Sequence, residues 1–340
     1  MSRGLGDVYK RQVDKNGKYP VYGASGRIGS METYQQEHQT VAVVKDGAGI
    51  GRTMLLPEKS SIIGTMQYLI PKNCIEPEYL YYAVKYMHLE KYFSGATIPH
   101  IYFRDYKTEE FNLHNKTEEQ EIISTLKRVE AVISNRREQL AMLDELVKAR
   151  FVEMFGDPIS NPFGFKVKTL QKMIDDGTIM YHLDGNHGSD YPRNEEFVEC
   201  GVPYISANCI VHNDVNLKLA KHLTEERASK LRKGIAQNGD VLFAHNATVG
   251  PVAILYTDDE KVILGTSLTA YRCDKERMVP DYLKAYMQSE GFVCQYTKDM
   301  KQTTRNQVPI TAQRKFLFVI PPLSLQNQFA AFAAEVDKSK

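Results

Sequence analysis

The most regular hydrophobic pattern in the chain runs from Thr117 to about Phe155, where apolar residues recur at alternating steps of four and three. This spacing is a heptad repeat, which draws one apolar stripe along a helix and predicts a coiled-coil seam. Thr117 with Gln120 is typical of a capping box, and Gly156-Asp157-Pro158 is typical of a helix stop. The seam consists of Ile122, Leu126, Val129, Ile133, Leu140, Leu143 and Val147, with Arg136, Arg150 and Met154 in the same register.

A seam of this length needs a partner helix. A second stripe of helical spacing begins close to the end of the sequence, which stops at Lys340. It consists of Gln326, Phe329, Phe332 and Val336. We therefore expect a distal helix, of which only the first part is present. The alternative is that the long helix packs only against its own domain.

On the two sides of the long helix, the same order of patterns occurs twice. A β-branched run leads into a glycine turn, a Gly-Thr step follows, and a Pro-Glu/Asp-Tyr-Leu segment then starts a helix, with proline suited to the first turn. A polar loop containing threonine comes next. These four features lie at 41–51, 64–65, 77–80 and 95–100 in the first copy, and at 239–250, 265–266, 280–283 and 302–306 in the second.

We therefore expect α/β (mixed α+β) domains in a tandem pseudo-repeat, separated by a long coiled-coil-type helix. The first domain is expected at 13–116, the central helix at 117–158, the second domain at 159–322 and the distal helix at 323–340. The first copy is shorter upstream of its glycine turn, so we expect it to lack its N-terminal part. Residues 1–12 join no pattern and are expected to be a foreign tail.

Composition narrows the class of protein. The chain has 340 residues, of which 42% are hydrophobic and 25% charged, as in a globular protein with two cores. It contains no run of 18 apolar residues, so no membrane segment is expected. Its five cysteines form no CxxC pair, which argues against a disulfide scaffold and favours a reducing cytoplasm. The net charge of +1 counts only weakly against nucleic acid, because binding depends on how charge is distributed.

Two motifs invite a chemical interpretation. The glycines at 47, 49 and 51 suggest a phosphate cradle, but the next residues read as a strand rather than a helix, so a β-turn is favoured. His182, Asp184, His187 and Asp190 suggest metal ligands, but they follow no metal-binding spacing and occupy a polar loop, so a structural or DNA-contacting loop is favoured.

Three catalytic signatures are missing from the sequence. It contains no Asn/Asp-Pro-Pro-Tyr/Phe methyltransferase motif, no GxxxxGK[ST] phosphate loop and no nuclease triad of the Pro-Asp…(Asp/Glu)-x-Lys type. These absences favour a binding module over an enzyme.

The chain resembles the specificity subunit of type I restriction–modification systems over about residues 13–340, with both ends truncated. The resemblance is carried by the glycine hairpins, the Gly-Thr steps and the Pro-Glu/Asp-Tyr-Leu helix starts described above. It is also carried by the Pro-Pro-Leu-Ser-Leu-Gln-Asn-Gln-Phe-Ala stretch at 321–330 and by the end of the long helix at 146–158. No single motif is diagnostic, but their order, repeated twice, is specific.

The resemblance implies the following function. Each α/β unit is a target-recognition domain that reads one half of a bipartite site in double-stranded DNA. The helices set the spacing and dock methyltransferase subunits through the heptad seam, and the restriction/translocase subunit joins through these. No catalytic residue, metal or cofactor is expected in this chain, since S-adenosylmethionine, ATP and Mg belong to the partner subunits. The complex is expected in the cytoplasm of a bacterium or archaeon.

Loop residues that can donate to phosphates or base edges are the candidate DNA contacts. The segment 298–315 is the most basic loop of the chain. Loss of Arg305 or Arg314 is expected to weaken DNA binding. The full candidate set is Lys45, Arg52, His100 and Arg104 in the first domain, and His187, His245, Asn246, Arg305, Asn306 and Arg314 in the second.

Two other functions remain open. The chain could be a coiled-coil scaffold whose α/β units bind protein, or the recognition half of a fused restriction–methylation enzyme. A positively charged concave face on each domain distinguishes a DNA reader from a scaffold. The DNA sequence itself cannot be derived, because specificity resides in a few loop side chains and in DNA shape.

Overall fold

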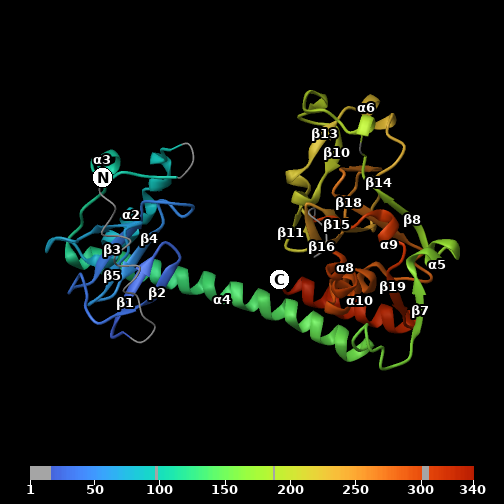
Figure 1. The fold of residues 1–340 in the computed structure, drawn as a ribbon, viewed down its shortest axis with the longest axis horizontal. Coiled ribbons are helices and arrows are strands. Elements are labelled where there is room, and N and C mark those ends of the chain that lie inside the picture. The colour runs from blue at the N-terminus through green and yellow to red at the C-terminus, as the bar shows by residue number, and fades with distance from the viewer. Residues whose placement is uncertain (1–16, 96–98, 187, 301–305) are drawn as a thin grey trace. The chain divides into compact units, whose positions relative to one another are not determined.

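A computed structural model of the chain describes residues 17–95, 99–186, 188–300 and 306–340 (Figure 1). The chain divides into two compact units, Met1–Arg136 and Arg137–Lys340, with the boundary inside one helix. Each unit is described by itself. None of the helices in the described ranges combines the length and apolar character needed to span a bilayer.

The predicted long helix is α4, a single helix of 40 residues from Lys116 to Phe155. Its capping box lies two residues before the predicted one. Asn115 Oδ1 accepts from the Glu118 amide at 3.0 Å, and Glu118 Oε2 accepts from the Asn115 amide at 3.2 Å. The prediction of Thr117 with Gln120 was therefore wrong, because both residues lie inside the helix. The predicted stop is confirmed: Gly156 has a φ of +73° and its amide donates to Val152 O at 2.8 Å.

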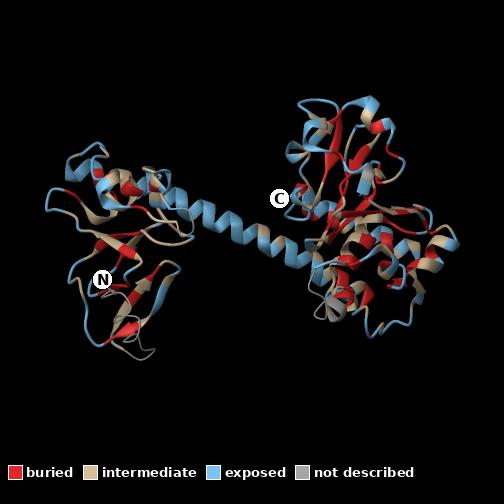
Figure 2. Ribbon diagram, turned by 45° about the horizontal axis from the view of Figure 1, so that its top comes forward, coloured by how far each residue is buried: buried red, intermediate tan, exposed pale blue. Residues whose placement is uncertain are grey.

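Unit 1 contains two small sheets. One has the strand order β2-β1-β5 and the other β4-β3-β6. Its strands are β1 (Tyr19–Gly23), β2 (Gly26–Met31), β3 (Thr40–Val44), β4 (Thr53–Leu56), β5 (Ser61–Ile62) and β6 (Met66–Leu69). Its short helices are α2 (Pro77–Tyr86), η1 (Leu89–Tyr92) and α3 (Phe103–Tyr106). Every residue of the central strand β3, Thr-Val-Ala-Val-Val, is buried, as expected for a β-branched run flanked by strands on both sides (Figure 2).

Unit 2 is built around a five-stranded sheet, β14-β17-β10-β13-β9, and a four-stranded sheet, β16-β15-β18-β8. The strands of these sheets are β8 (Ile179–Asp184), β9 (Phe197–Val198), β10 (Val202–Ile205), β13 (Lys221–Leu223), β14 (Ile235–Ala236), β15 (Val241–Asn246), β16 (Thr248–Ile254), β17 (Val262–Leu264) and β18 (Leu268–Cys273). Two further strand pairs join β7 (Lys166–Thr169) to β19 (Leu317–Ile320) and β11 (Ile210–Val211) to β12 (Asp214–Val215).

After α4, unit 2 contains several short α-helices and one longer helix at its C-terminal end. They are α5 (Leu170–Asp175), α6 (Glu225–Ser229), α7 (Pro280–Gln288), α8 (Glu290–Met300), α9 (Ile310–Gln313) and α10 (Leu323–Lys338). Single-turn 3₁₀ helices are η2 (Gly188–Asp190), η3 (Asn194–Glu196), η4 (Ala207–Cys209) and η5 (Leu217–Leu219).

The predicted pseudo-repeat is present in the topology. The antiparallel order β4-β3-β6 of unit 1 corresponds to β16-β15-β18 of unit 2, and the parallel pair β1–β5 corresponds to β10–β17. The Gly-Thr steps lie in the turns between β5 and β6 and between β17 and β18. The helices α2 and α7 both begin with proline. The mixed α/β fold class predicted from the sequence is confirmed.

The correspondence extends to single hydrogen bonds at the starts of α2 and α7. In unit 1, Glu119 Oε2 accepts from the Glu76 amide at 2.8 Å, and in unit 2, Gln326 Oε1 accepts from the Val279 amide at 2.9 Å. Both acceptors are fully buried and come from the long helix that follows. Each therefore satisfies an amide at a helix N-terminus that would otherwise lack a partner.

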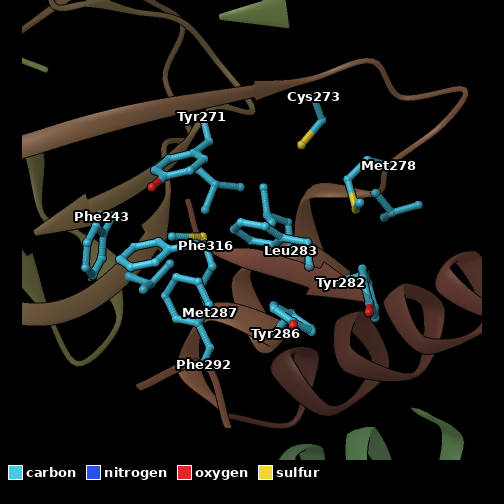
Figure 3. Packing of buried hydrophobic residues seen from close by; sticks show 14 of the residues in the cluster. Phe243, Tyr271, Cys273, Met278, Tyr282, Leu283, Tyr286, Met287, Phe292 and Phe316 are labelled. Atoms are coloured by element: carbon cyan, nitrogen blue, oxygen red, sulfur yellow. The ribbon is translucent and has the colours of Figure 1, made fainter. Parts of the chain in front are cut away.

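The main core of unit 2 is aromatic. The ring of Phe155 in α4 lies 4.8 Å from Tyr282 of α7 and 5.7 Å from Phe329 of α10, between centroids. Figure 3 shows the neighbouring part of this core, where Tyr286 and Phe292 pack with the other labelled side chains. The C-terminal part of α4 is thus an integral part of unit 2.

The expected partner of the heptad seam is α10, which runs antiparallel to the C-terminal part of α4. Phe329 contacts Phe151, and Lys340 Nζ lies 2.7 Å from Asp144 Oδ1. The middle of α4, residues 127–139, is exposed along its whole length (Figure 2). The seam residues there, Val129 and Ile133, are 49% and 45% exposed, whereas those nearer the ends of the helix are partly buried in their own units.

Candidate nucleic-acid interface

The turn that joins β3 to β4, residues 45–52, forms the hairpin tip of unit 1. A later segment, 99–101, pairs with it. The Gly47 amide donates to Pro99 O and the Ile101 amide donates to Lys45 O, both at 2.9 Å. Gly47 has a φ of +92°, and a side chain there would meet nothing within 4 Å. Glycine is therefore favoured here by the backbone conformation and not by crowding.

The hairpin tip of unit 2, residues 245–248, contains the end of β15, the turn at Ala247 and the start of β16, and it is built in the same way. The Ala247 amide donates to Asn306 O at 3.0 Å and the Val308 amide donates to His245 O at 2.8 Å. Ala247 has a φ of +63°, so a non-glycine residue holds the left-handed turn that Gly47 holds in unit 1. Of the segments 95–100 and 302–306, which the sequence pairs, most residues lie outside the described ranges. At their described end, Pro99 matches Asn306, one residue away from the expected match of His100 with Asn306.

Planar side chains lie against one another beside the tip of unit 1. The His100 ring lies 4.0 Å from the Tyr102 ring, and the Arg104 guanidinium lies 4.5 Å from the centroid of Tyr102. His100 Nδ1 also pairs with the Asp46 carboxylate. Tyr102 and Arg104 are exposed. Exposed rings and guanidinium planes of this kind offer stacking surfaces to bases.

Cations without a carboxylate partner among the described residues lie in the same tip and beside the turn between β1 and β2 that contacts it. Arg52 Nη1 donates to Ala24 O at 2.8 Å, which ties the tip to the turn between β1 and β2. Arg27, in the strand that follows this turn, donates to Ser30 Oγ at 3.1 Å. In the described part of the chain, Lys45, Arg52 and Arg27 form no ion pair. Such side chains are available for phosphate contacts.

The candidate residues of unit 2 fall into three groups. His245 is 2% exposed and its Nδ1 donates to Val308 O at 3.1 Å, so it supports the tip from inside and does not face solvent. Asn246 is half-buried at the tip, and Asn306 and Arg314 are exposed. His187 and Arg305, two of the predicted DNA contacts, lie outside the described residues.

Below the tip of unit 2 lies a buried polar network centred on Gln313 of α9. Gln313 Nε2 donates to Thr269 Oγ1 and to Val308 O, both at 3.0 Å. Gln313 Oε1 accepts from Tyr271 OH at 2.6 Å and from His182 Nε2 at 3.2 Å. Every hydrogen-bonding direction of the amide is used, so the network fixes α9 and the segment 306–308 against the sheet.

The two histidines of this region are uncharged structural groups. Burial lowers the pKa of His182 to about 4, and burial also lowers the pKa of His245. In the described ranges, no three histidine, cysteine, aspartate or glutamate side chains come together as a metal site. His182 thus has a structural role through its hydrogen bond to Gln313, and the function of the loop from Asp184 to Asp190 stays a prediction.

Three residues at the tips were not among the predicted contacts: Asp46, Tyr102 and Gln307. Asp46 and Gln307 are the bridge partners of His100 and Asn246, respectively. Their pairing depends on segments far apart in the sequence, so no local spacing indicates it. The one available signal is position, because Asp46 directly precedes the turn glycine.

Part of the chain matches a known protein family. Residues 5–143 match the family described as Type I restriction modification DNA specificity domain, and the match begins within the segment 1–12 that the sequence patterns set apart. A curated relative is the Type I restriction enzyme MjaIX specificity subunit of Methanocaldococcus jannaschii, 26% identical over 154 residues. That alignment covers 42% of this chain and 36% of the relative, so it spans little more than a third of the relative's length.

The fold is also similar to a solved one. The Type-I restriction-modification system S subunit from M. genitalium superposes with a TM-score of 0.54 at 17% identity, covering 97% of this chain and 84% of that one. At this identity the similarity concerns the fold alone. The region 5–143 is a type I DNA specificity domain. The match to residues 5–143 and the curated relative, a specificity subunit, confirm the resemblance to type I specificity subunits that was drawn from the motifs.

Proposed function

We propose that this chain is the non-catalytic DNA-recognition subunit of a type I restriction–modification complex, with each unit reading one half of a bipartite site in double-stranded DNA. One observation carries the proposal. The same hairpin tip, closed by the same pair of backbone hydrogen bonds, occurs once in each unit. Two copies of one recognition element on one chain suit a target with two halves.

The chemistry of the tips supports DNA as the ligand. Lys45 and Arg52 carry charge that no carboxylate of the described residues neutralises, and Tyr102 with Arg104 offers an exposed stack. Phosphate contacts give affinity and orientation, whereas side chains at the tips read base edges. The near-neutral net charge is compatible with this, because the unpaired cations are concentrated at one place in unit 1.

The helices supply the docking surface in this proposal. Val129, Val132 and Ile133 leave an apolar stripe exposed on the part of α4 that belongs to unit 1. We assign this stripe to methyltransferase subunits, through which the restriction/translocase subunit joins. S-adenosylmethionine, ATP and Mg are bound by those partners, and adenine methylation takes place on them.

The test is to express the chain with a type I methyltransferase subunit from its own genome and to map modified adenines in the DNA. A split, asymmetric methylated motif that disappears when this gene is removed is the expected result. A stable complex that methylates no motif would instead support a protein-binding scaffold. If the two proteins do not associate, the assignment of the α4 stripe is wrong.

A further inference from the structure

We propose that the residue pair bridging each hairpin tip distinguishes the two half-sites: Asp46 with His100 in unit 1, and Asn246 with Gln307 in unit 2. The proposal rests on the proposed function and adds to it the residues that determine specificity. It does not follow from the family, because it depends on a comparison between the two units of this chain.

The two pairs occupy matched backbone positions. Each is an isolated antiparallel bridge, flanked on one side by the amide of residue 47 or 247 and on the other by the amide of residue 101 or 308. Ile101 and Val308, next in sequence to the bridge residues, are buried. Since neighbouring residues of an extended segment point to opposite faces, His100 and Gln307 point away from the core.

The side chains at these matched positions differ in chemistry. Asn246 and Gln307 are carboxamides, which both donate and accept, and this is the pattern that pairs with the N6 and N7 edge of adenine. In unit 1 the carboxylate of Asp46 holds Nδ1 of His100, so only Nε2 of the ring remains for a base. One ring nitrogen cannot form the bidentate contact of a carboxamide, so unit 1 is set to read a different base.

The residues around the bridge pair are suited to contacts that do not depend on the DNA sequence, which leaves base recognition to the pair itself. Residues beside the bridge in unit 1 are suited to phosphate and stacking contacts: Lys45, Arg52 and the stack of Tyr102 with Arg104. These groups can bind DNA of any sequence, whereas the hydrogen-bond donors and acceptors of the bridge pair differ between unit 1 and unit 2. Asp46 acts as a positioning residue for His100, and His100 makes the contact.

The experiment selects DNA from a pool of random-sequence duplexes with the purified chain and sequences the bound fraction. The double variant Asp46→Asn/His100→Gln gives unit 1 the pair that unit 2 carries, and Asn246→Asp/Gln307→His makes the reverse exchange. Each exchange should change the preferred base in one half of the motif by about 5- to 100-fold and leave the other half unchanged.

A matched control is Glu37→Gln/His38→Gln, which removes one acid and one imidazole at exposed positions of the same unit. It should leave the whole motif unchanged. If the double variant of unit 1 has a lowered melting temperature, the single variant His100→Gln is used in its place in the selection, because its amide can still pair with Asp46.

The outcomes separate the two proposals. A wild-type chain that enriches no motif overturns the proposed function and this inference together. A wild-type motif that persists in folded Asp46→Asn/His100→Gln overturns the inference but leaves the function standing. A change in both halves from a single exchange also overturns it, because the pair would then act through the fold and not at its own half-site.

Discussion

Acid should destabilise unit 2 through His182, which lies on β8 with 6% of its surface exposed. Its Nε2 donates to Gln313 Oε1, and its Nδ1 has no hydrogen-bond partner among the described residues. A second proton on the ring would therefore lie in the interior without an acceptor. Burial is the main cause that lowers the pKa to about 4, and the Arg314 charge acts in the same direction, while Gln313 and Asp184 oppose it.

The direction and the size of this pH effect on stability follow from proton linkage. Because the pKa of His182 is about 4 in the fold and about 6.5 in an unfolded chain, the unfolded state binds the proton first. The stabilisation is complete above about pH 6.5 and is lost as the pH falls towards 4. A difference of about 2.5 pKa units corresponds to on the order of 3 kcal/mol. His245, whose pKa is also lowered by burial, adds to the loss in the same direction.

The assay is urea unfolding of the chain between about pH 7.5 and 4.5, followed by tyrosine fluorescence and circular dichroism. The control is His182→Gln, which has no group that titrates in this window. Its free energy of unfolding should be lower at neutral pH and should fall less steeply between pH 6.5 and 4.5 than that of the wild type. Equal slopes for the two chains would show that His182 does not bind the proton on unfolding, and the reasoning would be refuted.

Four further results are expected. Glu119→Ala should cost unit 1 about 1–3 kcal/mol because the partly buried Glu76 amide loses its acceptor, whereas Glu119→Gln, the residue type that unit 2 uses, should cost less; urea unfolding of both variants checks this. Gly156→Ala should lower the melting temperature, since φ is +73° and the added Cβ would lie 2.3 Å from Pro162 Cγ. Phe155→Ala should destabilise unit 2 by about 3–5 kcal/mol in the same unfolding assay, and a smaller loss would mean that the aromatic core closes the cavity. Arg52→Ala should reduce the salt dependence of DNA binding by about one phosphate contact for all sequences equally, and an altered motif would contradict this role.

The sequence predicts the elements that depend on local patterns. The heptad spacing predicts α4 to within one residue, and the glycine turns and proline helix starts predict the repeat. The capping box is misplaced because Asn115-x-x-Glu118 and Thr117-x-x-Gln120 fit the same rule, and only the first helical residue decides between them. Local signals are therefore enough for the order of elements but not for their terminal residues.

The candidate interface is less accessible to sequence reasoning because it depends on long-range pairing. His245 was expected at the DNA surface, yet strand β15 turns it inward, where it bonds to Val308 O, 63 residues away in the chain. Asp46 was not singled out, because its partner His100 is 54 residues away. Polarity and loop position identify the right segments, but which side chain faces outward is set by strand register.

The amide of Gln313 has a consequence for how such a protein can evolve. Its four hydrogen bonds are made to β8, β18 and the segment after the tip, and none is made to the side chains of Asn246 or Gln307. The side chains at the rim of the recognition unit, Asn246 and Gln307, thus share no hydrogen bond with the Gln313 amide beneath them. Substitutions at the rim should therefore be nearly neutral for folding, so a lineage can acquire a new target in a few mutational steps without passing through unstable intermediates.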